Sequence, residues 1–151
     1  MKRTLIVFTM LCSLSVPSYA QDISELLRAD LRANKTTLIT QAMALDPAQF
    51  EVFWPIYRAY EADLVKLNDE SLAAIKDYAE NYANMTDETA KDLLKRGFKI
   101  REGRTKLLKK YSSKVGKALS PKVAARWVQV EHALQAAIDL QMASELPLMG
   151  K

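Results

Sequence analysis

FWPIYRAYEADLVKLNDESLAAIKDY, residues 53–78, is the stretch that decides the fold of this chain. Within it, apolar, aromatic or small residues recur at alternating spacings of four and three: Phe53, Tyr57, Tyr60, Leu64, Leu67, Ser71, Ala74 and Tyr78. This spacing places the side chains on one face of an α-helix and is typical of helices that pack in bundles or coiled coils. The stretch therefore predicts a long helix whose apolar face packs against neighbouring helices.

Three helix-start signals divide the rest of the chain. Asp46-Pro47 and Ser120-Pro121 each combine a capping residue with proline at the first helical position, and Thr86 caps a third start. Short loops between such starts favour antiparallel neighbours. The predicted fold class is all-α, with about four helices arranged around a long antiparallel, coiled-coil-like hairpin. The predicted helices cover approximately 22–44, 47–83, 87–118 and 121–145.

Individual residues inside these helices carry further expectations. Pro55 should kink the second helix or delay its regular part. Gly97 and Gly103 each lower the helix preference of the third helix by about 1 kcal/mol relative to alanine, so each should permit a close helix approach or mark a bend. One apolar face of the last helix is formed by Trp127, Val130, Leu134 and Ile138.

The first twenty residues form a separate segment. Lys2 and Arg3 precede an apolar run at 5–14, and small residues lead up to Ala20. A membrane-spanning helix needs about 20 apolar residues, so the run is too short to span a bilayer, whereas the pattern is typical of a secretory signal peptide. We therefore expect cleavage between Ala20 and Gln21 and Sec-type export to the periplasm. The expected organisation is a signal peptide at 1–20 and a single helical domain at 21–151.

Charge is distributed unevenly along the chain. Cleavage would leave 20 basic and 18 acidic groups and would lower the formal charge from +4 to +2. Acids dominate residues 51–92, while bases dominate 95–126 against Glu102 alone. Either oppositely charged helices select their antiparallel pairing, or the bases form a surface for acidic partners, lipid head groups or lipopolysaccharide. The bases that we assign to such a surface are Arg101, Lys106, Lys109 and Lys110. Export argues against nucleic acid as the partner.

Residues that carry enzyme chemistry are scarce. His132 is the only histidine, the only cysteine (Cys12) lies in the predicted signal, and no glycine-rich phosphate loop is present. A metal site built from histidine and cysteine is thereby excluded, and a Ser-His-Asp triad would depend on His132 alone. Paired acids at helical spacing are usually solvated and do not indicate acid–base catalysis. We expect a protein that is not an enzyme and that uses no cofactor and no metal.

The second helix begins with more aromatic side chains than one face can bury. Phe50 and Trp54 fall off the stripe that contains Phe53 and Tyr57. Aromatic residues at helical spacing usually pack inward, which favours a core position for both. The alternative is that Phe50 and Trp54 line an apolar surface for a client protein or another partner.

The helix-start residues resemble a known motif. Leu45-Asp46-Pro47-Ala48-Gln49 is similar to the LTxxQ motif of small periplasmic helical proteins of the Spy/CpxP type, with aspartate in place of threonine. Residues 85–89 (MTDET) and 119–123 (LSPKV) resemble degenerate copies that lack the glutamine. A second pattern resembles a group of uncharacterised secreted bacterial helical proteins, which implies no activity. It consists of FWPIY at 53–57, Tyr78, MTDE at 85–88, KY at 110–111, AARW at 124–127 and ASELPL at 143–148.

The Spy/CpxP resemblance implies a helical cradle, often dimeric, that holds unfolded or misfolded envelope proteins without ATP, or that damps an envelope-stress sensor. We therefore expect a periplasmic, non-enzymatic, chaperone-like holder. The alternative is a regulatory partner of a membrane stress sensor, or a structural interaction protein. The histidine-rich metal segment of zinc-responsive relatives is absent, so we expect no metal-sensing role. The helical stripes fit a monomer and a homodimer equally well.

Overall fold

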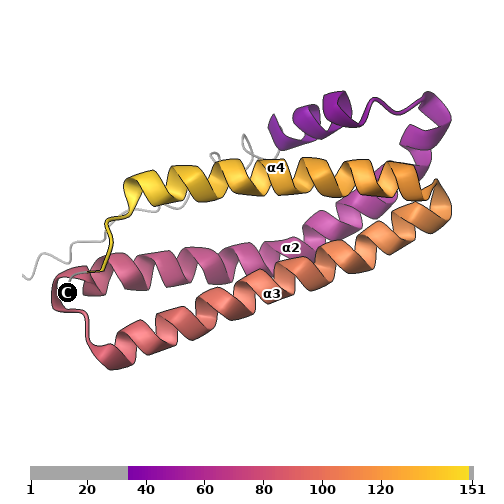
Figure 1. Ribbon diagram of the computed structural model, residues 1–151. Helices are drawn as coiled ribbons and strands as arrows, with labels where there is room; N and C mark the ends of the chain where they lie inside the picture. The colour runs from indigo at the N-terminus through magenta and orange to yellow at the C-terminus, as the bar shows by residue number, and fades with distance from the viewer. Residues whose placement is uncertain (1–33, 150–151) are drawn as a thin grey trace, which may run out of the picture. The chain divides into compact units, whose positions relative to one another are not determined.

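The computed structural model describes residues 34–149, and this part of the chain is helical and contains no strand. A short helix at 34–43 is followed by α2 (Pro47–Asn81), the 3-10 turn η1 (Tyr82–Asn84), α3 (Asp87–Ala118) and α4 (Pro121–Glu145) (Figure 1). The predicted all-α class is confirmed, and the observed ends of the three long helices lie within two residues of the predicted ones. The predicted signal peptide and its cleavage site at Ala20 and Gln21 lie outside the described residues.

Each long helix begins at the capping residue that the sequence predicts. The Asp46 carboxylate accepts a hydrogen bond from the Gln49 backbone N–H at 2.8 Å, and the Gln49 side chain accepts one from the Asp46 backbone N–H at 3.3 Å. Thr86 and Ser120 cap α3 and α4 through their hydroxyl oxygens, each at 3.2 Å from a backbone nitrogen three residues on. These side chains satisfy donors that a helix start leaves without partners.

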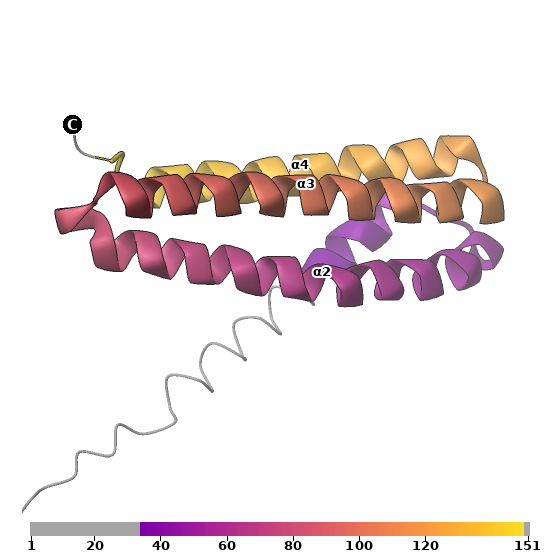
Figure 2. The same cartoon turned by 90° about the horizontal axis from the view of Figure 1, so that it is seen from below.

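From Leu38 onward the chain forms one compact unit, in which α2 and α3 pair as an antiparallel hairpin (Figure 2). Ion pairs join Asp63 to Lys110 and Asp77 to Arg96. Residues later in α2 therefore lie opposite residues earlier in α3, as in an antiparallel pair. α4 then runs back antiparallel to α3 (Figure 1). After α4 the chain returns to α2, where the Tyr78 hydroxyl donates a hydrogen bond to the Pro147 carbonyl at 2.6 Å.

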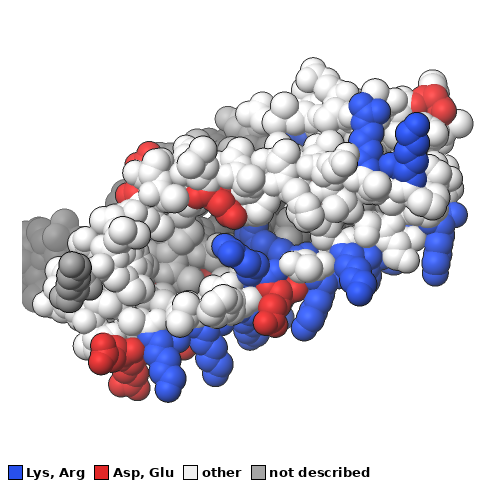
Figure 3. All heavy atoms as spheres, viewed as in Figure 1, with Lys and Arg blue, Asp and Glu red and all other residues white. Residues whose placement is uncertain are grey.

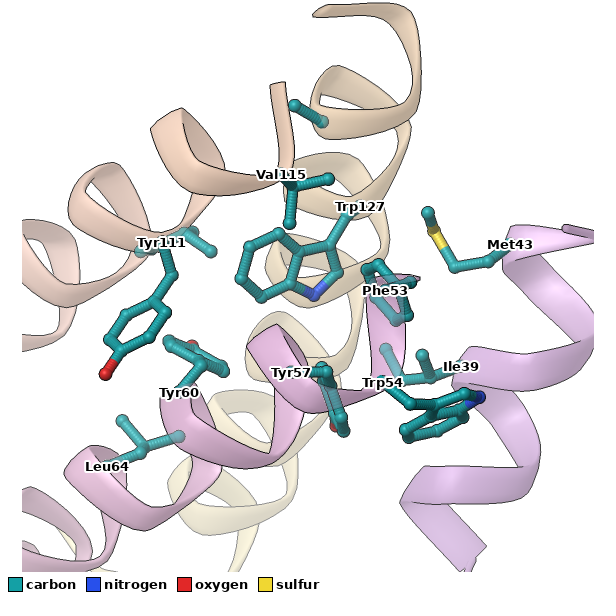
Figure 4. Close-up of a cluster of buried hydrophobic side chains, with 12 residues drawn as sticks. Ile39, Met43, Phe53, Trp54, Tyr57, Tyr60, Leu64, Tyr111, Val115 and Trp127 are labelled. Carbon is teal, nitrogen blue, oxygen red and sulfur yellow. The ribbon is translucent and has the colours of Figure 1, made fainter. Parts of the chain in front are cut away.

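The core is concentrated at the end of the unit where α3 turns into α4 (Figure 4). Trp127 of α4 is fully buried and packs edge-to-face against Phe53 and Tyr60 of α2, with ring centroids 5.8 and 5.1 Å away. Edge-to-face pairs of this kind are favourable beyond the apolar area that they bury. Further buried side chains complete the cluster: Ile39, Met43, Trp54, Tyr57, Leu64, Leu108, Tyr111, Val115 and Ala124.

Pro55 does not delay the regular part of α2. The helix begins at Pro47 and continues through Pro55 to Asn81. Proline removes one backbone hydrogen bond and its ring crowds the preceding turn, at a cost of about 3 kcal/mol inside a helix. The aromatic side chains on either side of Pro55, Phe53, Trp54 and Tyr57, are buried in the core, and their packing offsets this cost. The expected delay was therefore wrong.

Candidate functional site

Glu131 of α4 is the one charged side chain that is buried in the described part of the chain, with 5% of its surface exposed. Its carboxylate accepts hydrogen bonds from the Tyr60 hydroxyl at 3.2 Å and from the Trp127 indole nitrogen at 3.4 Å. Burial, followed by the charge of Glu131, raises the pKa of Tyr60 above its usual value, so its hydroxyl remains a donor even at alkaline pH. The carboxylate therefore ties α4 to α2 and is closed to a substrate.

A second polar contact joins α2 to α3 beside this core. Asp63 accepts hydrogen bonds from the Tyr111 hydroxyl at 2.6 Å and from the Lys110 ammonium at 3.0 Å. These two bonds, that from Tyr111 first, lower the pKa of the Asp63 carboxyl below its usual value. The ammonium of Lys114 lies 4.5 Å from the centre of the Tyr111 ring. The sequence-predicted partner residue Lys110 is thus engaged in helix pairing.

Arg104 marks the last level at which side-chain hydrogen bonds join all three long helices; farther along, Asp77 and Arg96 still join α2 to α3. From α3 its guanidinium donates to the side-chain oxygen of Gln135 on α4 and, at 2.9 Å, to that of Asn68 on α2. On one side of Arg104 lies the aromatic core, which we call the closed end. We call the other side, around Gly97 and Ile138, the open end.

The open end exposes the apolar face of α4. Trp127, Glu131, Leu134 and Ile138 follow one another at spacings of four, three and four, and so lie on one helix face. Trp127 is fully buried and Leu134 is half-buried, but 51% of the Ile138 surface is exposed. The face that packs into the core at one end of α4 is therefore only partly covered around Ile138.

Two glycines of α3 show that the helices lie closer together at one level than at another. A Cβ placed on Gly103 would lie 2.9 Å from the nearest methyl carbon of Leu67 on α2, so this glycine permits a close helix approach. A Cβ placed on Gly97 would meet no atom within 4 Å. Gly103 confirms the expected close approach, whereas Gly97 faces open space. Figure 1 shows α4 separating from the α2–α3 hairpin towards this end.

The bases of α3 form a separate surface (Figure 3). Acidic and basic helices do pair antiparallel, but within residues 34–149 only two ion pairs connect α2 with α3, through Arg96 and Lys110. Lys106 and Lys109 are exposed and have no acidic partner among the described residues. Arg101 is also exposed but lies on another side of the helix, since it precedes Lys106 by five residues.

The aromatic residues assigned to a possible partner surface lie at the closed end. Trp54 is buried and contacts Phe50 edge-to-face, with ring centroids 5.4 Å apart. Trp54 thus occupies the core position that its spacing favoured, while Phe50 remains 38% exposed. By the register of α2 on α3, Trp54 lies about 20 Å along the helices from Lys106. The structure therefore does not combine the aromatic and basic residues in one site.

The described part of the chain was also searched for metal centres and membrane-spanning helices, and the chain was compared with known proteins. No group of three or more His, Cys, Asp or Glu residues could hold a metal ion there. None of the described helices is long and apolar enough to cross a membrane. Comparison with known proteins found no family model, no curated protein and no solved structure that matches this chain. The candidate site is therefore defined by surface geometry, and its two parts are the open end and the exposed bases of α3.

Proposed function

We propose that this protein is a non-enzymatic, chaperone-like holder of unfolded or misfolded polypeptide segments in the periplasm. One observation carries the proposal: Ile138 lies on the core-facing stripe of α4 and yet is half exposed. The stripe thus continues past Arg104, the last residue whose side-chain hydrogen bonds reach both α2 and α4, into a region where Gly97 leaves open space.

Such a region suits an unfolded chain for physical reasons. Unfolded and partly folded chains expose apolar side chains that folded proteins bury. An exposed apolar stripe on a folded scaffold offers these side chains a surface to pack on, and such patches often mark interaction sites. Half-buried Ile100 and Leu134 extend the surface around Ile138. The predicted signal peptide and the LTxxQ-like helix starts support a client from the cell envelope.

The proposal is tested by aggregation of a denatured client. A chemically denatured protein is diluted into buffer with increasing amounts of this protein, without ATP, and light scattering is recorded. We expect scattering to fall in proportion to the amount of protein added. Unchanged scattering at a several-fold excess would contradict the proposal.

Two residues of α4 provide a matched pair of variants. Ile138→Gln places a polar group on the uncovered core-facing stripe. Leu140→Gln makes a similar change on the same helix, but Leu140 is 73% exposed and two residues on, so it points away from that stripe. Ile138→Gln should lose the suppression of scattering and Leu140→Gln should keep it. Equal behaviour of the two variants would place client binding elsewhere.

A second copy of this chain is the competing occupant of the open end. In that case the protein would be a dimer in sedimentation experiments, and Ile138→Gln would convert it to a monomer. The wild-type dimer would then leave client aggregation unchanged, because its apolar stripe would already be covered. That combination of results would replace the holder proposal with a structural role.

A further inference from the structure

Five of the lysines on one exposed face of α3 define what we call the α3 basic face: Lys95, Lys99, Lys106, Lys109 and Lys117. Their spacings of four, seven, three and eight residues keep them within about a quarter of the helix circumference. At 1.5 Å per residue the face extends over roughly 33 Å. Glu102 is the one acid that interrupts it.

This face is not used to pair the helices. The ion pairs that join α2 to α3 employ Arg96 and Lys110, which lie towards α2. None of the five lysines forms an ion pair with another described residue, and all five are exposed. Figure 3 shows the basic side chains projecting from the α3 edge of the molecule. A predominance of positive charge over this extent attracts an external anion.

Apolar surface accompanies the α3 basic face at both of its ends. Near Lys95, the side chains of Leu94 and Phe98 are 62% and 59% exposed. Near Lys109, α3 and α4 leave an open groove of about 560 Å³, lined mainly by small or apolar residues: Ser112, Ser113, Gly116, Pro121, Ala124, Ala125 and Val128. Exposed aromatic and aliphatic groups beside lysines are typical of helices that lie in the interface of a membrane.

We propose that the α3 basic face docks on a membrane surface that contains anionic phospholipids. Five flexible ammonium groups spread over about 33 Å match a planar array of phosphates better than they match one anion. Leu94 and Phe98 would insert at the level of the head groups and add apolar contact. Client holding at the open end depends on different residues from those of the α3 basic face. A test can therefore contradict membrane docking without contradicting client holding, and the reverse.

The test is sedimentation of the purified protein with lipid vesicles at low and high salt. One vesicle population contains phosphatidylcholine alone and the other adds about one-third phosphatidylglycerol. We expect the protein to bind only the anionic vesicles and to be released by salt, because salt screens exposed charges. No binding to anionic vesicles at low salt would overturn the proposal.

Matched triple variants locate the surface. Lys99→Gln, Lys106→Gln and Lys109→Gln remove three charges from the α3 basic face, and should lower vesicle binding about fivefold per charge, hence about a hundredfold. Arg58→Gln, Lys66→Gln and Lys76→Gln remove the same charge from exposed positions of α2 and should lower it far less. Equal losses would show attraction by net charge alone and would overturn the proposal. Circular dichroism checks that both variants are folded.

Two further measurements, competition by polyglutamate and fluorescence of an added tryptophan, determine whether the partner is a lipid surface or an acidic protein. Polyglutamate should displace the protein from vesicles only weakly, because it offers no apolar phase for Phe98. Trp54 and Trp127 are buried, so Phe98→Trp adds an exposed reporter, whose fluorescence should shift to the blue on anionic vesicles. Binding to polyglutamate as tight as to vesicles, with no blue shift, would identify an acidic polypeptide as the partner and contradict lipid docking.

Discussion

The two halves of α4 carry the same apolar stripe in opposite surroundings. At the closed end Trp127 is fully buried among rings of α2, and Glu131 has hydrogen-bond donors for both carboxylate oxygens. At the open end Ile138, on the same helix face, is half exposed. The difference shows that an amphipathic pattern defines the apolar face of a helix but not what covers it. In this protein one half of the stripe stabilises the fold, and we assign the other half to binding.

Truncation of an apolar side chain should have the largest effect and should differ most between the two ends. Trp127→Ala empties a fully buried site and should lower the free energy of unfolding by about 3–5 kcal/mol. Ile138→Ala should cost less than about 1 kcal/mol, because much of that side chain is in water in the folded state. Urea denaturation followed by circular dichroism measures both. Similar costs would show that the open end is closed in solution.

Removal of the buried carboxylate should have the next largest effect. Glu131→Ala leaves the Tyr60 hydroxyl and the Trp127 indole N–H without their acceptor in the core, at a cost of about 2–3 kcal/mol. Glu145→Ala, at the exposed last turn of α4, serves as the control and should change the stability by less than about 0.5 kcal/mol. A stable Glu131→Ala protein would mean that the carboxylate does not hold α4 on α2.

The glycines of α3 offer a smaller test with opposite signs. Gly97→Ala adds a methyl group in open space and should stabilise the protein by about 1 kcal/mol, the difference in helix preference. Gly103→Ala gains the same preference but forces the Leu67 methyl groups to move, so its net effect should be near zero or destabilising. Thermal unfolding of the two variants compares them directly. Equal stabilisation would contradict the difference in helix spacing.

Alkaline pH should destabilise the closed end from the pH at which tyrosine of the unfolded chain begins to titrate. Burial first, and then nearby carboxylates, raise the pKa of Tyr57 and Tyr60. Because the pKa is raised in the folded state, the contribution to stability is fully present below about pH 10, where unfolded tyrosine titrates, and is lost as the pH rises further. Urea titrations at increasing pH should show a steeper loss than in a Tyr57→Phe, Tyr60→Phe variant. Identical slopes would mean that both phenols ionise freely in the folded protein.

Local signals in the sequence were sufficient for the helices and most of the core. Asp46, Thr86 and Ser120 begin the helices because their side chains bond the backbone only three residues on. Heptad spacing likewise identified Phe53, Tyr57 and Tyr60 as core residues. For Pro55 the expected delay was wrong because its cost is local, whereas the packing that offsets it comes from distant residues.

The candidate site was less predictable because it depends on how the helices separate. The spacing of Ile138 places it on the same helix face as Trp127, but no local pattern reveals that half of its surface is exposed. Lys109 and Lys110 are adjacent and chemically identical, yet only Lys110 reaches Asp63 of α2. The periodicity of the sequence predicts that both lysines lie near the polar face of the helix. It does not indicate which of the two forms the ion pair.

Amide hydrogen exchange along α4, with and without a denatured client, tests the central claim most directly. In the free protein we predict that the amides of residues 124–131 exchange only on global unfolding, and that those of residues 138–145 exchange much faster by local opening. Added client should slow exchange in the second group and leave the first unchanged. Uniform protection along α4 in the free protein, or client protection confined to the closed end, would contradict the account.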